Sequence, residues 1–168
     1  MKNLKSLLLI AVFTLGVAGV SNAQKVGHID FEKLVAAMPQ TKTLKSNIEK
    51  LGKTYQDDIE GMGKTIEATQ KKYMAESQSQ TNQKNEERAK ELQVEAGKLE
   101  QLRRTAYQDM QKRQNDGLQP IIETAQKAIE EVAAAKGIVY ILDASVGKGL
   151  LVKKGEDIYS AVKTKLGF

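Results

Sequence analysis

The chain has no cysteine, no tryptophan, two prolines and one histidine among its 168 residues, and aromatic side chains make up 5% of it. The absence of cysteine excludes a disulfide framework and a lipid-acylated cysteine. Because large aromatic residues are scarce, the chain has little material for a three-dimensional core. Its stability must come from helix packing or from assembly with other chains, and assembly is the interpretation we favour.

The shortage of histidine and cysteine also argues against catalysis. A metal site needs more ligands than His28 alone, and no nucleophile has a histidine base other than that residue. The Gly147-Lys148-Gly149 sequence lacks the earlier glycine and the following Ser or Thr of a phosphate-binding loop. Paired carboxylates such as Asp57 and Asp58 fall in a repetitive charged segment, where solvation explains them. We therefore predict no enzyme, no metal and no cofactor.

The first 23 residues have the pattern of an export signal. Two lysines precede an uncharged run over residues 6–20, and the small residues Ser21 and Ala23 stand at positions minus three and minus one of a cleavage site. The apolar part is too short and too interrupted by glycine for a membrane anchor. We predict a signal peptide over residues 1–23, cleaved after Ala23, which leaves an exported soluble protein of 145 residues with a net charge of +3.

A long apolar stripe dominates the next part of the chain. Apolar and aromatic residues recur in steps of three and four over residues 44–73, which places them on one face of a helix. They are Leu44, Ile48, Leu51, Tyr55, Ile59, Met62, Ile66 and Tyr73, with the polar Thr69 in the same series. Leu44, Tyr55 and Ile66 are eleven residues apart, a period of about 3.67 that suits a nearly straight rod.

A second stripe of similar length follows a polar segment. Residues 77–83 are all polar and predict a turn, and apolar residues then recur over residues 92–132. Two long helices joined by a short turn form an antiparallel hairpin, which we expect to project from the body of the protein.

The position of the turn decides which residues of the two helices lie opposite each other. A turn at the middle of the polar segment places Ile66 near Val94, and Tyr55 near Arg104 or Tyr107.

Glycine and proline mark places where these helices are weakened. Gly117 and Pro120 predict a bend in the second helix, where the arm becomes the body. Glycine inside a helix costs about 1 kcal/mol relative to alanine, which favours flexible arms. The glycines inside the arm are Gly52, Gly61, Gly63 and Gly97.

The two ends of the chain predict a small sheet. Residues 25–29 read as a strand, residues 138–142 as a continuous apolar strand covered on both faces, and residues 150–152 as a third strand after a reversal at glycine. A helical patch at residues 31–35 ends before the first proline, and Asp157 is the expected N-cap of a final helix. Three strands leave open edges that need partners.

These observations predict an α+β fold, mostly α, in which a long antiparallel helical hairpin stands on a small β body. Residues 41–118 form the arm, and residues 24–40 and 119–168 form a β-rich oligomerisation body. The body is built from the N- and C-terminal strands, which come together beside the base of the arm.

Several short segments carry a resemblance to a known family. In order, they are the Val26-Gly27-His28-Ile29-Asp30 strand, the charged hairpin, the Tyr140-Ile141-Leu142-Asp143 strand, the strand at residues 150–152 and the closing Asp157-Ile158 helix. With the signal peptide before them, they resemble the Skp/OmpH family of periplasmic chaperones over essentially the whole mature chain. The resemblance implies a trimer whose strands form a small barrel, and three hairpins that surround a cavity for unfolded outer-membrane proteins.

Two groups of arm side chains are candidates for contacts with such clients. The apolar group would form a soft, promiscuous wall, or alternatively the seam between the two helices. The basic group would meet acidic client segments, lipopolysaccharide or an anionic membrane surface, or alternatively form a solvated helix face. The candidates are Tyr55, Met62, Lys71, Lys72, Tyr73, Arg103, Arg104, Tyr107 and Met110.

We therefore expect an ATP-independent holdase chaperone of the periplasm, a homotrimer that binds unfolded outer-membrane proteins and no nucleic acid. The alternative is a structural coiled-coil scaffold or tether of the cell envelope. Over residues 41–118, 15 Lys or Arg stand against 13 Asp or Glu, so net charge is not expected to be the main attraction for clients.

Overall fold

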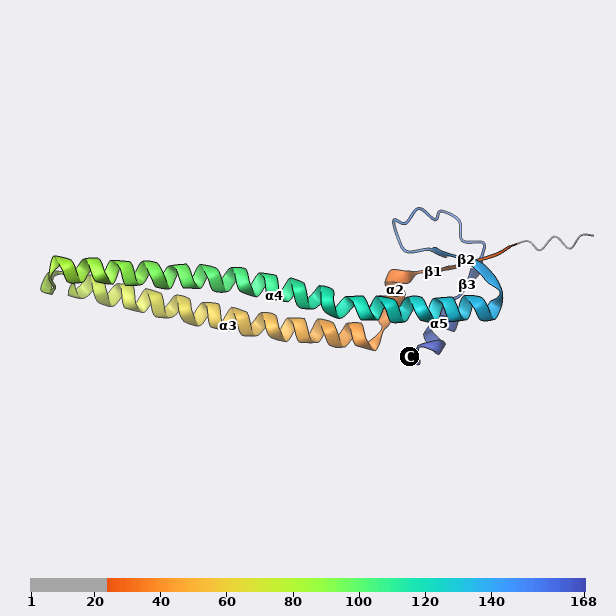
Figure 1. The fold of residues 1–168 in the computed structure, drawn as a ribbon, viewed down its shortest axis with the longest axis horizontal. Helices are drawn as coiled ribbons and strands as arrows, with labels where there is room; N and C mark the ends of the chain where they lie inside the picture. Colours follow the sequence, from red (N-terminus) through yellow and green to blue (C-terminus); the bar gives the residue numbers. More distant parts are fainter. Residues whose placement is uncertain (1–23) are drawn as a thin grey trace, which may run out of the picture.

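The structure is a computed structural model that describes residues 24–168. The expected signal peptide, residues 1–23, and its cleavage site after Ala23 lie outside the described residues. Two long helices dominate the chain, and the strands and short α-helices gather at one end of them (Figure 1). Within residues 24–168, no helix is long and apolar enough to cross a membrane.

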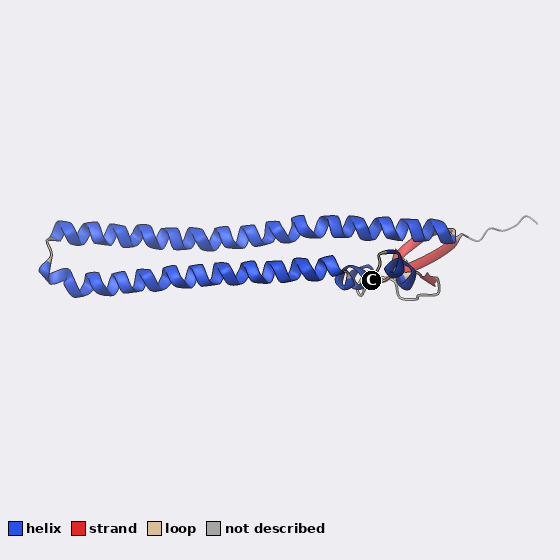
Figure 2. Cartoon of the chain, turned by 90° about the horizontal axis from the view of Figure 1, so that it is seen from below, coloured by secondary structure: helices blue, strands red, loops and turns tan. Residues whose placement is uncertain are grey.

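The arm is a hairpin of helices α3 (Pro39–Glu76) and α4 (Asn82–Lys136). The two helices run side by side in both views, and their connection lies far from the strands (Figures 1 and 2). At a rise of 1.5 Å per residue, the 38 residues of α3 extend about 57 Å. Helix α4 has 55 residues and continues past the start of α3, so one helix serves both the arm and the body.

The ends of the arm helices have local causes. Met38 has extended backbone angles because it precedes a proline, and Pro39 is the first residue of α3, two residues before the expected start. At the tip, the 3-10 helix η1 (Ser77–Ser79) prolongs α3. Thr81 then begins α4, because its Oγ1 accepts a hydrogen bond from the backbone N–H of Lys84 at 3.2 Å.

Helix α4 is not interrupted at Gly117 and Pro120. Both residues lie inside one continuous helix, and Thr124 Oγ1 donates to the Pro120 carbonyl at 2.7 Å. The helix ends at Gly137, whose φ of 65° is the left-handed conformation typical of a residue that closes a helix. The expected end of the helix at Gly137 is therefore confirmed. The expected bend between Gly117 and Pro120 stays a prediction, because a continuous helix can still curve there.

The sheet has the order β2-β1-β3, and both strand pairs are parallel. Its strands are β1 (Lys25–Ile29), β2 (Ile138–Asp143) and β3 (Glu156–Asp157). Parallel neighbours need a crossover, and here the connection from β1 to β2 contains the whole arm. The arm is therefore an insertion between two adjacent strands.

The hydrophobic core lies around the C-terminal third of α4. Its buried residues come from the sheet, from α4, from α2 (Phe31–Ala37) and from the start of α5 (Tyr159–Lys165). They are Ile29, Leu34, Met38, Ile121, Ala125, Ala128, Val132, Ile138, Ile158 and Val162. The four α4 members follow steps of four, three and four, which is one helical face, and the body is therefore organised on that face.

Two expectations about the strands are wrong. Residues 150–152 form no strand, and Leu151 and Val152 are 94% and 62% exposed, because no backbone of the described chain lies beside them to pair with. Strand β2 is not covered on both faces, since Val139 and Tyr140 are 57% and 56% exposed. Helix α4 covers only one side of the strand.

The final helix also begins later than expected. Asp157 belongs to β3, and α5 starts at Tyr159 with Ile158 as its N-cap. The Asp157 carboxylate still accepts a hydrogen bond from the Tyr159 N–H at 2.8 Å, which is the chemistry expected of a cap. The expected fold class is confirmed, with a long helical hairpin and a small three-stranded sheet in a mostly helical chain.

Candidate functional site

The arm has almost no enclosed interior. No residue of α3 is fully buried, and Ala106 is the one fully buried residue on the part of α4 that precedes the body. A row of half-buried residues, together with the buried Ala106, lies between the helices and is here called the seam. It consists of Leu44, Ile48, Leu51, Tyr55, Ile59, Met62, Ile66, Thr69 and Tyr73 on α3, and Arg88, Leu92, Glu95, Leu99, Leu102, Ala106 and Met110 on α4.

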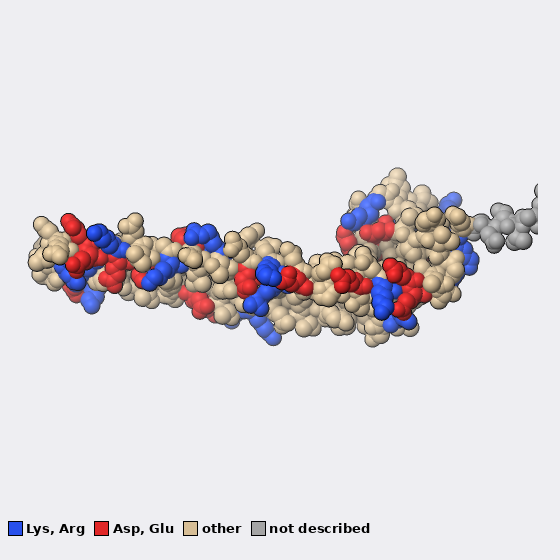
Figure 3. All heavy atoms as spheres, in the orientation of Figure 1, with Lys and Arg blue, Asp and Glu red and all other residues tan. Residues whose placement is uncertain are grey.

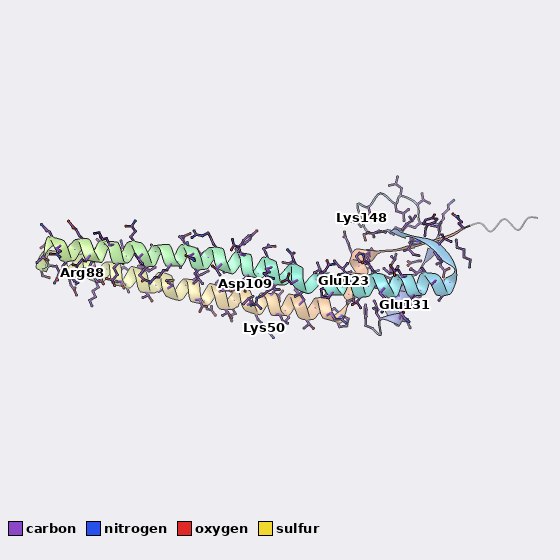
Figure 4. The ribbon with its side chains drawn as sticks, in the orientation of Figure 1. Lys50, Arg88, Asp109, Glu123, Glu131 and Lys148 are labelled. Atoms are coloured by element: carbon purple, nitrogen blue, oxygen red, sulfur yellow. The ribbon has the colours of Figure 1, made fainter. Side chains whose placement is uncertain are left out.

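A polar cross-link joins the helices in the lower half of the arm. The Tyr55 hydroxyl donates to Asp109 Oδ2 at 3.0 Å, and Arg113 Nε donates to the same oxygen at 2.8 Å. The hydrogen bonds from Arg113 and Tyr55 lower the pKa of Asp109, and the hydrogen bond to Asp109 raises the pKa of Tyr55. Asp109 is labelled midway along the arm in Figure 4.

A second set of polar contacts joins the helices near the tip. The Tyr73 hydroxyl donates to Glu91 Oε2 at 2.8 Å, and Arg88 Nη2 donates to Glu76 Oε2 at 2.5 Å. The Arg88 guanidinium also lies over the Tyr73 ring, 4.5 Å from its centroid. Arg88 is labelled near the tip of the arm in Figure 4. The Arg88 side chain is only 13% exposed, whereas the residues on either side of it in the sequence are exposed. Arg88 therefore packs between the two helices as part of the seam.

These contacts correct the expected pairing of the two helices. Tyr55 meets Asp109 rather than Arg104 or Tyr107, and Tyr73 meets Glu91. The reversal is therefore centred on residue 82 instead of the middle of residues 77–83. The 3-10 turn that prolongs α3 and the late cap at Thr81 move it toward the C-terminus.

The shifted centre also separates Ile66 from Val94. A reversal centred on residue 82 places Ile66 level with residue 98 rather than with Val94. Ile66 and Leu92 line the same cavity of about 190 Å³, and Val94 is 56% exposed on the outside of the arm. Leu92 and Val94 are two residues apart and point to different faces of α4, so Val94 does not belong to the seam.

The apolar candidates divide between the seam and the surface. Tyr55, Met62, Tyr73 and Met110 are half-buried members of the seam, whereas Tyr107 is 64% exposed. Exposure alone would have added Met74 and Val94, which are 68% and 56% exposed. Sequence reasoning missed these two because neither fits the helical stripe that marks the seam.

The basic candidates are all exposed, but they differ in their ion pairs. Lys71 Nζ lies 2.6 Å from Glu67 and Arg103 Nη1 lies 2.6 Å from Glu100. Among the described residues, Lys72 and Arg104 make no ion pair within 4.0 Å. Positive and negative side chains alternate along the face of the arm that Figure 3 shows, so this face has no extended region of one charge.

The base of the arm is closely packed on one side and open on the other. A Cβ atom built on Gly117 would lie 3.0 Å from Leu44 Cδ2 and 3.3 Å from Leu44 Cγ, with Cδ1 closer still. Beside this contact is an open cavity of about 590 Å³, lined among others by Met38, Pro120 and Ile121. Gly117 thus allows α3 to approach α4 where the arm leaves the body.

The body presents a second exposed apolar surface, here called the open face, which consists of Val139, Tyr140, Leu142, Val146, Leu151 and Val152. Val146 and Leu151 are more than nine-tenths exposed, in the connection between β2 and β3 that Figure 4 marks with Lys148. A monomeric protein rarely leaves so many large apolar side chains together in water.

The single histidine is a body residue. His28 is 8% exposed in β1, where it pairs with Leu142 of β2 and Asp157 of β3, and its Nδ1 is buried without a hydrogen-bond partner. Within the described part of the chain, no group of three or more His, Asp or Glu side chains is placed to hold a metal ion.

The chain matches a family model over most of its length. The model of the OmpH-like outer membrane protein family matches residues 25–166, which is nearly all of the described chain. A crystal structure from Caulobacter crescentus CB15, described as an OmpH-like outer membrane chaperone, has the same fold with a TM-score of 0.76 at 15% sequence identity. The match covers 85% of this chain and 83% of that one. A comparison with curated protein sequences finds no significant relative.

Proposed function

Since the chain belongs to the OmpH-like outer membrane protein family, we propose that it is an ATP-independent holdase chaperone of the periplasm that binds unfolded outer-membrane proteins. In this proposal the clients lie between the arms of a homotrimer. The observation that carries the proposal is the construction of the arm, in which α3 and the part of α4 that precedes the body stand away from the core, with a half-buried seam between them and most other side chains exposed.

A surface of this kind suits a client that has no fixed structure. The arm offers scattered apolar side chains such as Met74, Val94 and Tyr107 among charges of both signs. Each contact is weak, but many contacts on several arms act together, so that affinity comes from avidity. The client stays disordered while it is bound, and its folding elsewhere drives release without a nucleotide.

The open face supports assembly into a homotrimer. Strand β2 is at an edge of the sheet and its Val139 and Tyr140 side chains are exposed, and residues 150–152 pair with no strand of the described chain. Residues 150–152 have the composition of a strand, and a neighbouring copy is a natural source of the missing backbone partner. Three bodies joined in this way would hold three arms around one cavity.

The unpaired basic residues extend the proposal to anionic surfaces. Lys72 and Arg104 on the arm and Lys154 in the body have no ion pair within the described chain, so their charges are free for acidic client segments or the phosphates of lipopolysaccharide and membrane lipids. We expect such contacts to weaken as salt rises, because exposed charges are screened beyond about 8 Å at physiological ionic strength.

Suppression of aggregation tests the proposal directly. The mature chain, residues 24–168, is mixed at one assembly per client with an outer-membrane β-barrel protein that is diluted from urea, and light scattering is followed without ATP. We expect the client to stay soluble and to remain competent to fold into detergent micelles. If scattering is the same as with an inert protein of equal concentration, the chaperone proposal is wrong and a scaffold or tether of the envelope is favoured. Cleavage after Ala23 is tested separately, by the intact mass of the protein that is exported from cells making the full 168-residue chain.

A further inference from the structure

The middle of the arm contains three glycines at positions where a larger side chain would fit without a clash. A Cβ atom built on Gly61, Gly63 or Gly97 would meet nothing within 4 Å. Two other helical glycines differ, since a Cβ on Gly52 would contact Met110 Sδ at 3.4 Å and one on Gly117 would press into Leu44. Each glycine in the middle of a helix makes local unfolding of the helix roughly fivefold easier than alanine would.

The three glycines lie at one level of the arm, although they come from both helices. Lys64 is nine residues from both Tyr55 and Tyr73, and Glu100 is nine residues from both partners of these tyrosines, Asp109 and Glu91. Residues 64 and 100 are therefore opposite each other, halfway between the two cross-links. Each of the three glycines is within three residues of one of these midpoints, which is about 5 Å along a helix axis.

No polar cross-link strengthens this level. Within the described chain, no hydrogen bond or ion pair connects residues 56–72 of α3 with residues 92–108 of α4. The cavity of about 190 Å³ lies in this interval, between Met62, Ile66 and Leu92, and the polar Thr69 occupies a seam position beside it. Within this interval the described helices are therefore held together by apolar packing without a polar contact between them.

We propose that the arm has a flexible joint at Gly61, Gly63 and Gly97, which divides it into two stiff halves. The lower half is fixed by the contact of Tyr55 with Asp109, and the upper half by the contacts of Tyr73 with Glu91 and of Arg88 with Glu76. If the chain acts as the holdase proposed above, the joint lets the upper halves close over clients of different size while the base keeps its position.

Spin labels on α3 test the joint without a client, so the result is independent of the proposed function. The chain has no native cysteine, and Lys50→Cys and Ala75→Cys place labels at exposed positions 25 residues apart, about 37 Å along the helix. Labelled protein is diluted with unlabelled protein so that most assemblies carry one labelled copy. We expect pulsed electron resonance to give a broader distance distribution than a rigid helix allows.

The decisive variant carries Gly61→Ala, Gly63→Ala and Gly97→Ala, for which the structure has free space. We expect its distance distribution to narrow and its mean distance to approach that of a straight helix. The matched control carries Thr54→Ala, Thr105→Ala and Asn115→Ala, which are exposed positions in the lower arm that also gain helix propensity. We expect the distance distribution of the control variant to remain as broad as that of the unmodified protein.

Amide exchange gives a second readout in the same proteins. Peptides covering residues 58–66 and 95–101 should exchange faster than peptides around Tyr55 and Tyr73, and each alanine should slow exchange of its own peptide by roughly fivefold. Three results would overturn the proposed joint. They are a narrow distance distribution in the unmodified protein, a distribution in the triple glycine-to-alanine variant that is as broad as in the unmodified protein, and equal narrowing of the distribution in the control variant.

Discussion

Tyr55 Oη donates a hydrogen bond to Asp109 Oδ2 at 3.0 Å, and this contact joins the two arm helices across 54 residues of sequence. The same carboxylate accepts from Arg113 at 2.8 Å, so that one acidic residue of α4 connects a neighbour on its own helix with the facing helix. The contact fixes which turns of α3 and α4 lie side by side in the lower arm.

Removing the hydroxyl of Tyr55 should loosen the arm. Tyr55→Phe keeps the ring in the seam but loses the hydrogen bond to Asp109, and we expect a loss of about 1 kcal/mol in the free energy of unfolding, followed by circular dichroism in urea. Tyr107→Phe is the control, because Tyr107 is 64% exposed and makes no hydrogen bond within the described chain. Equal stabilities for the two variants would contradict a role for the cross-link.

The close approach of Leu44 and Gly117 should be sensitive to side-chain volume. Gly117→Val places two methyl groups where Leu44 already lies, and we expect a destabilisation of about 1–3 kcal/mol in thermal or urea unfolding. In a Leu44→Ala background the same substitution should cost less, because the space is then free. Additive effects of the two changes in this double-mutant cycle would show that the contact is not tight.

Acid should weaken the body through Asp143. Burial by itself raises the pKa of this carboxyl, but hydrogen bonds from the Ser145 hydroxyl and N–H and from the Phe31 N–H outweigh it and lower the pKa below its ordinary value of 3.8. A lowered folded pKa means that the stabilisation is present above pH 3.8 and is lost as pH falls through the folded value.

Asp143→Asn isolates this contribution. We expect the variant to be less stable than the unmodified protein at neutral pH and to lose less stability below pH 3.8, when the free energy of unfolding is measured against pH. The difference between the two proteins should therefore shrink in acid. A constant difference at all pH values would exclude the ionised Asp143 as its source.

The open face should be required for assembly. Val139→Glu together with Leu151→Glu places charges on side chains that are 57% and 94% exposed in the single chain, and we expect the mass in sedimentation equilibrium to fall from that of a trimer to that of a monomer. Met74→Glu near the tip, where the side chain is 68% exposed, is the matched control and should leave the mass unchanged. A monomeric unmodified protein would contradict the proposed assembly at once.

The unpaired basic residues should contribute more to client affinity than the paired ones. Lys72→Ala with Arg104→Ala removes two charges that have no ion pair within the described chain, and we expect affinity for an unfolded barrel protein to fall about two- to fivefold at low salt. Lys71→Ala with Arg103→Ala is the comparison, since those charges are already matched by Glu67 and Glu100. Both affinities are measured by fluorescence anisotropy of a labelled client. A larger loss of affinity in the Lys71→Ala, Arg103→Ala variant than in the Lys72→Ala, Arg104→Ala variant would contradict the role of the unpaired charges.

The sequence was sufficient to predict those elements that local patterns determine. The stripe from Leu44 to Tyr73 predicts α3, and its partner stripe predicts α4, because a helix buries one face whatever the rest of the chain does. Gly137 predicts the end of α4 because a left-handed residue there suits glycine best. The fold class follows from these two helices and the strands at the chain ends.

What depends on another segment could not be predicted in the same way. Asp109 is one acid among many on a charged helix, and only the centre of the turn decides that it meets Tyr55. Residues 150–152 have the composition of a strand but have no partner in the described chain, so their pattern alone does not decide their structure. For the same reason the client-binding residues remain a proposal, since an exposed arm side chain and a binding side chain look alike in one sequence.

The insertion of the arm between β1 and β2 sets an order of events in folding. The central strand of the sheet is made first, yet both of its neighbours, at residues 138–143 and 156–157, are among the last parts of the chain to be synthesised. The hairpin needs contacts only between helices that follow each other, and such local contacts form sooner than pairings that close a loop of more than a hundred residues. In a newly made chain the helical hairpin therefore forms before the body. Until the C-terminal strands are made, the backbone of β1 around Val26 and Ile29 has no neighbouring strand to pair with.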